Sequence, residues 1–233
     1  MNSITIIVPA YNEEKNLEGV VLSLIETLNG LKSRWKIIIV NDASTDDTEL
    51  VANKLSSENE EVTVLHNKEN INLGGSYKRA LGFVETELVS WIPGDGEIPS
   101  DIFLEVIPYA SQDTIVTTYP INSFQARSLF RYTLSKIYRT AMNLLFGLNV
   151  RYQNGTSVIP TKVLKEKELL SEGFTINLEI LIRAFRSNLE VIEVPFSLEK
   201  RGYGESSAIS FRRLYFLTKT LVKLFISNVK GDT

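Results

Sequence analysis

Short apolar runs alternate with amphipathic stretches through the first half of the chain, and this alternation constrains the fold more than any other feature of the sequence. Five of the runs are short, rich in β-branched residues and bounded by Pro, Asn or Gly, which is typical of buried strands. They span residues 4–8, 36–40, 62–66, 88–92 and 114–118, and the helical patterns between them span 13–28, 46–56, 75–85 and 100–109. This alternation predicts an α/β, Rossmann-like fold with a mostly parallel central sheet flanked by helices.

After residue 118 the rhythm changes, but nothing marks a second folding unit. The chain continues with an amphipathic segment at 124–146, an irregular polar stretch, helical patterns at 161–170 and 177–187, and a strand-like run at 190–196. We find no internal repeat, low-complexity tract or linker rich in Pro and Ser. The expected organisation is one α/β domain at residues 1–209, followed by an amphipathic helix and tail at 210–233.

The composition limits the possible partners and compartments. With 233 residues, 43% of them hydrophobic, the chain is long enough for one sizeable core. A net charge of −3 gives no reason to expect nucleic acid as a partner, and the absence of cysteine excludes disulfides and thiolate metal sites. Residues 1–4 carry no basic group, and no apolar stretch reaches the roughly 18 residues of a membrane span. We therefore expect a cytoplasmic protein, or one bound peripherally to the cytoplasmic face of the membrane.

Polar side chains gather where the predicted strands end, which is the edge at which α/β sheets bind ligands. The turn after the first strand contains Pro9, Tyr11, Asn12 and Glu13. Tyr11 can stack on a ligand or hydrogen-bond to it, while Asn12 and Glu13 can contact a base or a ribose. The alternative is an ordinary strand-to-helix turn in which Asn12 caps the next helix. Both interpretations fit this segment.

The second predicted strand ends in Asn41 and Asp42, which Ser44 and Asp46 follow closely. An aspartate at the carboxyl end of a strand is well placed to accept hydrogen bonds from the base or ribose of a nucleotide. Helix capping is the alternative, and it accounts well for Ser44 and Asp46. It accounts less well for Asp42, which we predict to be a nucleotide ligand.

The glycine pair Gly74 and Gly75 opens a predicted helix that also carries Lys78 and Arg79. A diphosphate can approach glycines closely, where helix N–H groups and a cation such as Lys78 would meet it. The alternative is a tight turn that requires glycine for its own geometry. The segment is neither a G-x-G-x-x-G nor a Walker sequence, so it gives little support to a dehydrogenase or a P-loop protein.

The loop after the fourth predicted strand contains two carboxylates, Asp95 and Glu97, on either side of Gly96. Carboxylates at this spacing can share one divalent cation with a diphosphate, because Mg²⁺ and Mn²⁺ prefer oxygen ligands. The alternative is a Gly-Asp-Gly turn with solvated acids. We predict Asp95 and Glu97 as metal ligands and Gly94 as a neighbour of the bound diphosphate.

Two further features lie at predicted strand ends. A glycine-spaced loop at 199–207 carries Arg201, and such loops can close over phosphates that a guanidinium binds bidentately. Its alternative is a flexible surface connection. His66 is the only histidine of the chain, so no second imidazole can share a metal with it. We assign His66 a structural role.

In this order and spacing, these segments resemble the family 2 glycosyltransferases of the GT-A fold. The likeness is greatest to the branch that includes dolichol-phosphate mannose synthases and bacterial polyprenyl-phosphate glycosyltransferases. It covers residues 4–207 and rests on the segments 9–13, 41–46, 72–75, 93–95, 193–195 and 201–207. In that family the first two segments hold the nucleotide, the third is an Asn-x-Gly-Gly segment, and the fourth is the metal-binding motif.

The resemblance implies an enzyme that moves a sugar from a nucleotide-diphosphate sugar to an acceptor with inversion, using Mg²⁺ or Mn²⁺. The favoured acceptor is a polyprenyl phosphate, dolichyl or undecaprenyl, whose ionised oxygen needs no general base. Its phosphate would be bound by Arg127, Arg131 and Arg201, all cationic groups suited to phosphate. Asp95 and Arg201 are then the predicted catalytic residues.

Three departures from the family pattern keep alternatives open. Pro93 stands where the first metal-binding aspartate is usual, Asn41 replaces the first of two paired aspartates, and residues 151–156 lack the usual Asp-x-Thr-x-Gly pattern. Transfer to a saccharide or glycan hydroxyl is one alternative, with Glu179 as the candidate base. A catalytically silent scaffold that binds nucleotide sugars is an alternative of a different class, and Pro93 motivates it.

The segment 211–226 interleaves basic residues with bulky apolar ones. Such a helix can lie in a membrane interface, with its basic residues near anionic headgroups. Packing its apolar stripe on the domain is the alternative, and the sequence favours neither.

Overall fold

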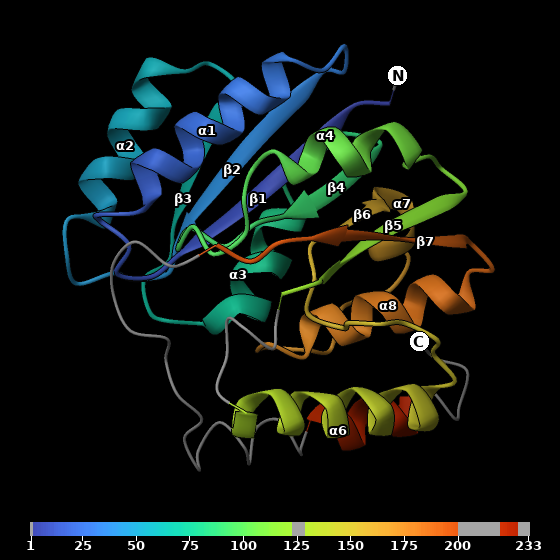
Figure 1. Ribbon diagram of the computed structural model, residues 1–233. Coiled ribbons are helices and arrows are strands. Elements are labelled where there is room, and N and C mark those ends of the chain that lie inside the picture. The colour runs from blue at the N-terminus through green and yellow to red at the C-terminus, as the bar shows by residue number, and fades with distance from the viewer. Residues whose placement is uncertain (1, 123–128, 200–219, 228–233) are drawn as a thin grey trace.

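A seven-stranded sheet forms the centre of the computed structural model, which describes residues 2–122, 129–199 and 220–227 (Figure 1). Its strand order is β3-β2-β1-β4-β6-β5-β7. The strands are β1 (Ile4–Ala10), β2 (Trp35–Asn41), β3 (Val62–His66), β4 (Leu88–Trp91), β5 (Thr114–Pro120), β6 (Ser157–Pro160) and β7 (Glu190–Phe196). All pairings are parallel except the two that β6 makes. The predicted α/β class and mostly parallel sheet are confirmed.

Strand β6 is the element that the sequence did not predict. It runs antiparallel between β4 and β5, pairing Val89 with Ile159 and Val116 with Val158. All four of its residues are buried, so it has no polar face to give an alternating pattern. A buried four-residue run is too short to be recognised by periodicity, and only its pairing partners identify it as a strand.

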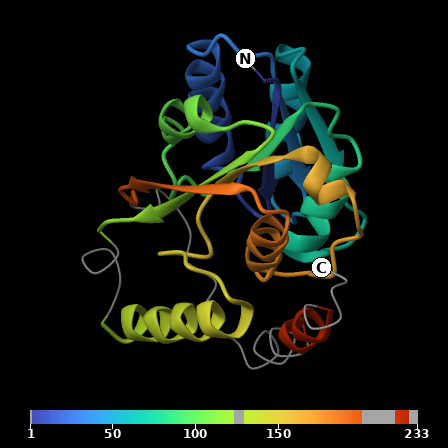
Figure 2. The ribbon, with the colours of Figure 1, turned by 90° about the vertical axis from the view of Figure 1, so that its right-hand side faces the viewer.

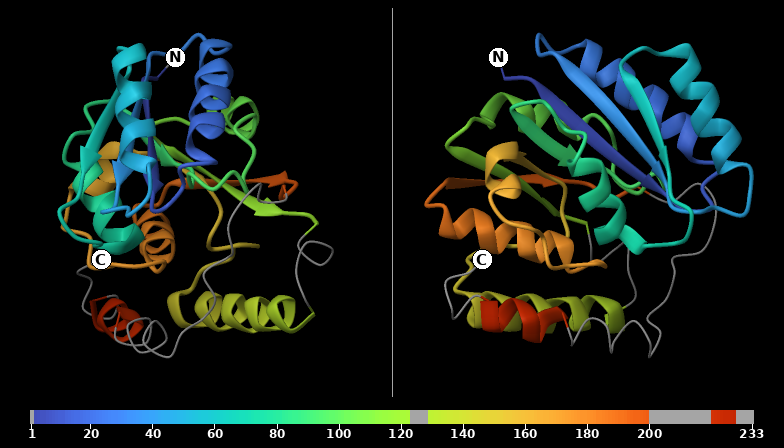
Figure 3. Two further views of the ribbon diagram at one scale, coloured as in Figure 1. Left: turned by 90° about the vertical axis from the view of Figure 1, so that its left-hand side faces the viewer. Right: turned by 180° about the vertical axis from the view of Figure 1, so that it is seen from behind.

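Helices cover both faces of the sheet (Figures 1 and 3). One face carries α1 (Leu17–Asn29), α2 (Thr48–Glu58), α4 (Ile102–Val106) and the 3₁₀ turn η1 (Ile107–Tyr109); the other carries α3 (Asn72–Leu81), α7 (Thr161–Lys165) and α8 (Ile176–Arg186). A buried apolar cluster lies under each set of helices. Helix α1 begins four residues later than predicted, and α7 ends five residues earlier, because side chains from other elements hold the flanking backbone.

A further layer packs on the outward side of α8. It consists of α6 (Leu129–Phe146) and a helix at residues 220–227, which lie side by side below α8 in Figures 2 and 3. Helix α8 is therefore buried on two sides, and Leu178 and Leu181 face this outer layer while Ile180 faces the sheet. The polar residues Glu179 and Arg183 of this helix are also buried, and they form an ion pair with each other.

The structure decides part of the question about segment 211–226. Residues 211–219 lie outside the described part of the chain, whereas 220–227 packs on the domain. Leu224 is fully buried, and the ring of Phe225 meets that of Phe146 edge to face, 6.4 Å apart. Burying a leucine side chain stabilises the fold by about 1.5–3 kcal/mol. None of the described helices is long and apolar enough to cross a membrane.

Candidate functional site

The carboxyl ends of β1, β2 and β4 bring three of the predicted segments together. Backbone hydrogen bonds continue past the strand ends, from Asp42 N to Ala10 O at 2.9 Å and from Gly94 N to Pro9 O at 3.2 Å. Gly94 has little free space, since a Cβ there would lie 3.3 Å from Pro9 O. The β1 turn, Asp42 and the 94–97 loop are therefore neighbours at one edge of the sheet, as the sequence predicted.

The turns after β1 and β2 are hydrogen-bonded to each other. Asn12 adopts a left-handed φ of 57°, its N–H donates to Ser44 Oγ at 3.0 Å, and its Oδ1 accepts from Thr45 N at 2.8 Å. Glu13 N donates to Thr48 Oγ1 at 2.8 Å. Asn12 and Ser44 thus bridge two loops, and the interpretation of either residue as a helix cap is wrong. Tyr11 stays 48% exposed beside this junction, so its ring is accessible to a ligand.

Asp46 completes this junction. Its Oδ1 accepts from Thr48 N at 3.1 Å and from Thr48 Oγ1 at 2.5 Å, and its Oδ2 accepts from Glu14 N at 3.3 Å. Burial raises the pKa of Asp46, but these hydrogen bonds outweigh it, so the pKa lies below its ordinary value. The carboxylate stays ionised near neutral pH and stabilises the first turn of α2.

Asp42 is almost fully buried, and one of its oxygens is fixed by the protein. Oδ1 accepts from Asn67 Nδ2 at 2.7 Å and from Ile71 N at 2.9 Å. No described donor bonds to Oδ2. Asn67 is held in turn, since its Nδ2 also lies 3.0 Å from Ser76 Oγ and its Oδ1 accepts from Arg79 Nη1. A chain of hydrogen bonds from Arg79 through Asn67 therefore orients the Asp42 carboxylate.

His66 has the structural role that the sequence indicated. Its Nδ1 lies 3.2 Å from Asn41 Nδ2, and its Nε2 lies 3.0 Å from Asn53 Oδ1. Asn41 Oδ1 accepts from Ser44 N at 3.1 Å. Asn41 and Asn53 thus hold both ring nitrogens. The side chain of Asn41 is therefore engaged with β3 and the β2 turn, whereas that of its neighbour Asp42 bonds to Asn67 and Ile71.

The glycine pair packs against a loop instead of presenting free N–H groups. Gly74 N and Gly75 N both donate to Glu172 O, at 3.1 and 3.3 Å. A Cβ on Gly74 would lie 2.5 Å from the Glu172 carbonyl carbon, so no other residue fits there. The N–H groups that we expected to meet a diphosphate are already bonded in this conformation. Lys78 is half-buried and makes no hydrogen bond or ion pair with the described residues.

Glu179 holds the same loop from the opposite side. It is fully buried, and its carboxylate accepts from Leu170 N at 2.8 Å and from Ser171 N at 2.7 Å. Arg183 Nη2 lies 2.8 Å from Glu179 Oε1 and also donates to Glu168 O. The interpretation of Glu179 as a general base is wrong, because a saturated and buried carboxylate has no access to an acceptor. Glu179 stabilises the 167–172 loop on which the glycine pair packs.

The 94–97 loop presents Asp95 at the predicted site. Gly96 takes a φ of 75°, which turns Glu97 N toward Asp95 Oδ1 at 3.0 Å. Both carboxylate-bearing residues are half-buried. Within the described residues no group of three or more acidic or histidine side chains could enclose a metal. A cation here would need the phosphates of a ligand to complete its coordination, which is the usual arrangement for Mg²⁺.

The chain that leads to Arg201 reaches the same loop. Glu199 N donates to Glu97 O at 3.0 Å, and the side chain of Asn122 exchanges two hydrogen bonds with the backbone of Leu198. Arg201 itself and Arg127 lie outside the described residues, and Arg131 belongs to α6.

The segment 151–156 forms the other wall of this edge, and sequence reasoning did not find its contacts. Thr156 Oγ1 donates to Trp91 O at 3.1 Å, and its own carbonyl accepts from Thr118 Oγ1 at 3.0 Å. Gly155 lies so close to β5 that a Cβ would be 2.0 Å from Thr118 O. A lone glycine before a threonine gave no signal of this, because the contact depends on β6 lying between β4 and β5.

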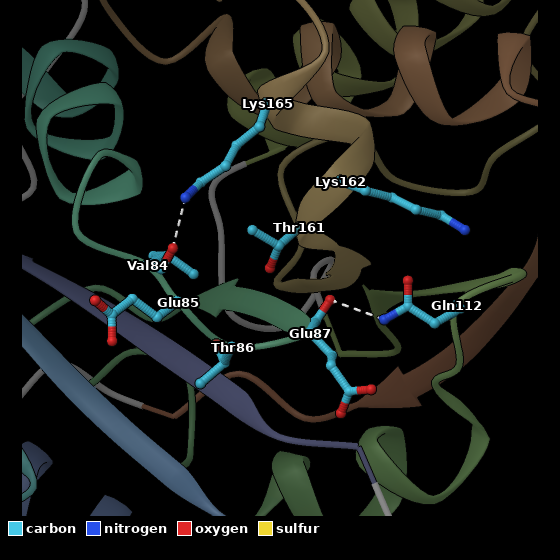
Figure 4. A pocket seen from close by; sticks show the side chains of 8 residues that line it. All are labelled: Val84, Glu85, Thr86, Glu87, Gln112, Thr161, Lys162 and Lys165. Carbon is cyan, nitrogen blue, oxygen red and sulfur yellow. Dashed lines mark hydrogen bonds between the residues drawn. The ribbon is translucent and has the colours of Figure 1, made fainter.

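A hollow of about 510 Å³ lies at the opposite edge of the sheet from the predicted site, where β4 begins (Figure 4). Lys165 Nζ donates to Val84 O at 2.6 Å there, and Gln112 Nε2 donates to Glu87 O at 3.2 Å. These bonds tie α7 and the start of β5 to the beginning of β4. None of the residues predicted for the site lies in this hollow.

Comparison with known proteins gives a consistent result. Residues 5–174 match the family described as glycosyl transferase family 2. The chain is 36% identical over 123 residues to a dolichyl-phosphate beta-glucosyltransferase of Trichomonas vaginalis, covering 49% of this chain and 37% of that protein. It is 29% identical to the dolichol-phosphate mannosyltransferase of Pyrococcus furiosus and 25% identical to a dolichyl-phosphate beta-glucosyltransferase of Saccharomyces cerevisiae. These matches cover 87% and 83% of this chain, but only 58% and 66% of those proteins.

Solved structures share the fold. Glucosyl-3-phosphoglycerate synthase of Mycobacterium tuberculosis, determined with Mn²⁺, uridine-diphosphate-glucose and phosphoglyceric acid, has a TM-score of 0.70 at 17% identity. The match covers 97% of this chain and 79% of that one. A structure of the same enzyme with Mg²⁺ and uridine-diphosphate has a TM-score of 0.66 at 18% identity. The expected GT-A fold is confirmed by this likeness.

Proposed function

The chain belongs to glycosyl transferase family 2, and we propose that it transfers a hexose from a nucleotide-diphosphate sugar to a polyprenyl phosphate, with inversion. The observation that carries the proposal is the grouping of the β1 turn, Asp42 and Asp95 at one edge of the sheet. The dolichyl-phosphate relatives support the acceptor class. Residues 1–209 are proposed as the catalytic domain and 210–233 as an appended helix and tail.

The nucleotide would lie across the ends of β1 and β2. Asp42 offers Oδ2 to an N–H of the base or a hydroxyl of the ribose, because its Oδ1 is already held by Asn67 and Ile71. Tyr11 offers an accessible ring for stacking on the base. Pro9, Asn12 and Glu13 would shape this pocket, since Pro9 O bonds to Gly94 N and the N–H groups of Asn12 and Glu13 bond to Ser44 and Thr48.

The diphosphate would extend toward the 94–97 loop. The residues there fit Mg²⁺ or Mn²⁺ held by Asp95, with Glu97 beside it, and completed by the donor's own phosphates. Such a cation, when bound, neutralises charge on the departing nucleoside diphosphate. Gly94, tight against Pro9, keeps this loop close to the nucleotide. Gly74 and Gly75 would act indirectly by packing the 167–172 loop, and Lys78 is the cation available nearby.

The reaction needs no general base from the protein. An ionised phosphate oxygen of the acceptor attacks the anomeric carbon and forms a C–O bond, while the bond from that carbon to the diphosphate oxygen breaks. The bonding electron pair leaves with the nucleoside diphosphate. Arg201 follows the Glu199 contact with the 94–97 loop, so its guanidinium is proposed to bind the acceptor phosphate together with Arg127 and Arg131.

An apolar surface supports a peripheral membrane position, in keeping with a lipid-linked acceptor. On α6, Leu134, Ile137, Leu144 and Leu145 are 40–80% exposed, and on the 220–227 helix Val222 and Ile226 are about half exposed. Both helices lie in the same outer layer (Figure 2). We expect this layer to rest on the membrane interface.

The direct test is an assay of purified protein with a panel of nucleotide sugars, Mg²⁺ or Mn²⁺, and undecaprenyl or dolichyl phosphate in detergent. Formation of a lipid-linked sugar with release of a nucleoside diphosphate supports the proposal. Turnover only with saccharide acceptors would replace the proposed acceptor by a hydroxyl. Donor binding without turnover on any acceptor would identify a nucleotide-sugar-binding scaffold instead.

A further inference from the structure

A hollow of about 570 Å³ lies between the second half of α6 and the segment that follows it. Its walls include Arg139, Asn143 and Leu144 from α6, Leu148 and Arg151 from the next segment, and Glu193 from β7. We call this hollow the α6 cleft. A volume of this size accommodates a small organic ligand or a lipid headgroup. None of the residues predicted to bind the donor or the acceptor phosphate lines it, although Arg151 begins the 151–156 segment described above.

The α6 cleft contains two guanidinium groups, of Arg139 and Arg151, and one carboxylate, of Glu193. Arg139 donates from Nη1 to Arg151 O at 3.3 Å, and no carboxylate of the described residues lies within ion-pair distance of it. Arg151 Cζ lies over the ring of Tyr119, 4.6 Å from its centroid, while Arg151 Nη1 donates to the Tyr119 hydroxyl and Nε lies 3.8 Å from Glu193 Oε2. The other oxygen of Glu193 accepts from Arg151 N at 2.6 Å. The cleft therefore has donors aimed by fixed contacts and an excess of positive charge.

An apolar surface borders the α6 cleft on one side. Leu144 lines the cleft and is also 80% exposed, and Leu134, Ile137 and Leu145 continue the exposed apolar stripe along α6. In chain order, Leu134, Ile137, Leu144 and Leu145 are separated by three, seven and one positions, which places them on one side of a helix. Lys136 is exposed on the same helix. Cationic donors next to an exposed apolar stripe match the two halves of an amphiphile with an anionic head.

We propose that the α6 cleft binds the phosphate headgroup of an anionic phospholipid of the bilayer, with Arg139 and Arg151 as its ligands. Guanidinium binds phosphate with two parallel hydrogen bonds, and a site at the membrane surface would receive the headgroup while the leucines contact the acyl chains. The inference rests on the proposed membrane-facing role of α6. It adds a lipid site that is separate from the acceptor phosphate.

Vesicle co-sedimentation tests the proposal with full-length wild-type protein and the variants Arg139→Gln, Arg139→Lys and Arg151→Gln. The matched control is Arg34→Gln, because Arg34 is an exposed arginine that lies just before β2, away from the α6 cleft. We expect Arg139→Gln and Arg151→Gln each to weaken binding to phosphatidylcholine vesicles that contain phosphatidylglycerol about tenfold. Each substitution removes one hydrogen bond between a charged side chain and the headgroup phosphate. Arg139→Lys should recover part of the binding, and Arg34→Gln should match wild type. Thermal unfolding by circular dichroism checks that every variant is folded.

Three outcomes would overturn the proposal. Equal losses of vesicle affinity in Arg34→Gln and Arg139→Gln would mean that vesicle binding depends on the net charge of the protein alone. Unchanged binding in both cleft variants would exclude the cleft as the site. Abolition of vesicle binding by inorganic phosphate at the concentration of the headgroups would identify a soluble anion as the ligand. Nucleotide binding and sugar transfer by the wild-type protein are measured separately, so a failure of the proposed enzymatic function would be distinguished from a failure of the lipid site.

Discussion

Asn67 offers a sharp test of how the donor site is organised, because it contacts Asp42 but lies behind it. Its Nδ2 donates to Asp42 Oδ1 at 2.7 Å and to Ser76 Oγ at 3.0 Å, while its Oδ1 accepts from Arg79. In Asn67→Ala the carboxylate keeps a single protein donor, Ile71 N. A hydrogen bond to a charged group contributes about 1.5–3 kcal/mol. If about half of the upper figure orients the carboxylate for the nucleotide, donor affinity falls roughly tenfold.

Isothermal titration with uridine- and guanosine-diphosphate would measure this loss, and steady-state kinetics would separate its effects on KM and kcat. We expect KM for the donor to rise about tenfold while kcat stays near wild type, because Asn67 does not touch the reacting atoms. Asn70→Ala is the matched control, since Asn70 Nδ2 reaches only the backbone carbonyl of Asp42, at 3.3 Å. An Asn67→Ala protein that is folded and binds nucleotide as tightly as wild type would refute the reasoning.

Three further predictions concern stability and ionisation. Gly74→Ala should lower the free energy of unfolding by about 1–3 kcal/mol in chemical denaturation, because the new Cβ would lie 2.5 Å from the backbone of Glu172. Gly19→Ala in α1 is the control: a Cβ there meets nothing within 4 Å, so the substitution should raise the free energy of unfolding by about 0.5–1 kcal/mol. Equal effects of the two substitutions would contradict the packing argument. Glu179→Gln should lower the free energy of unfolding by about 3 kcal/mol with kcat of the folded protein retained; a folded variant of unchanged stability that has lost kcat would restore Glu179 as a base. Burial raises the pKa of Tyr138 to about 12. The contribution of Tyr138 to stability is therefore complete below the ordinary tyrosine pKa near 10 and is lost as pH rises toward 12. In an ultraviolet titration of phenolate, Tyr138→Phe should lack the ionisation step near pH 12, and a titration curve equal to that of wild type would contradict the assignment.

The strand pattern was predictable because six of the seven strands are apolar runs bounded by turn residues. β3 and β7 have the predicted bounds, while β1, β2, β4 and β5 differ by a few residues at their ends. β6 was missed because it is buried on both faces and depends on neighbours from β4 and β5. Local pattern therefore predicts the parallel core well, and the antiparallel insertion depends on tertiary pairing that a single short run does not encode.

The edge of the site was predictable for a similar reason, since residues that follow parallel strands must meet. Pro9, Asp42 and Gly94 are brought together as expected. The roles of individual side chains were harder to predict. Ser44 was interpreted as a cap and instead bonds to Asn12 of another loop, and Glu179 was considered as a base and instead binds backbone N–H groups. Those contacts join residues that are 32 and 8 positions apart, and residue type alone does not reveal the partner.

The central claim is that Asp95 and Asp42 belong to one donor site that binds a nucleoside diphosphate together with a divalent cation. Titration calorimetry of uridine- and guanosine-diphosphate, with Mn²⁺ and with a chelator, on wild type and Asp95→Asn tests it most directly. We predict that Mn²⁺ strengthens wild-type binding at least tenfold and that Asp95→Asn removes this gain, because the substitution removes the charge that holds the cation. Nucleotide binding that is the same with Mn²⁺ and with chelator, and the same in Asp95→Asn, would contradict the account.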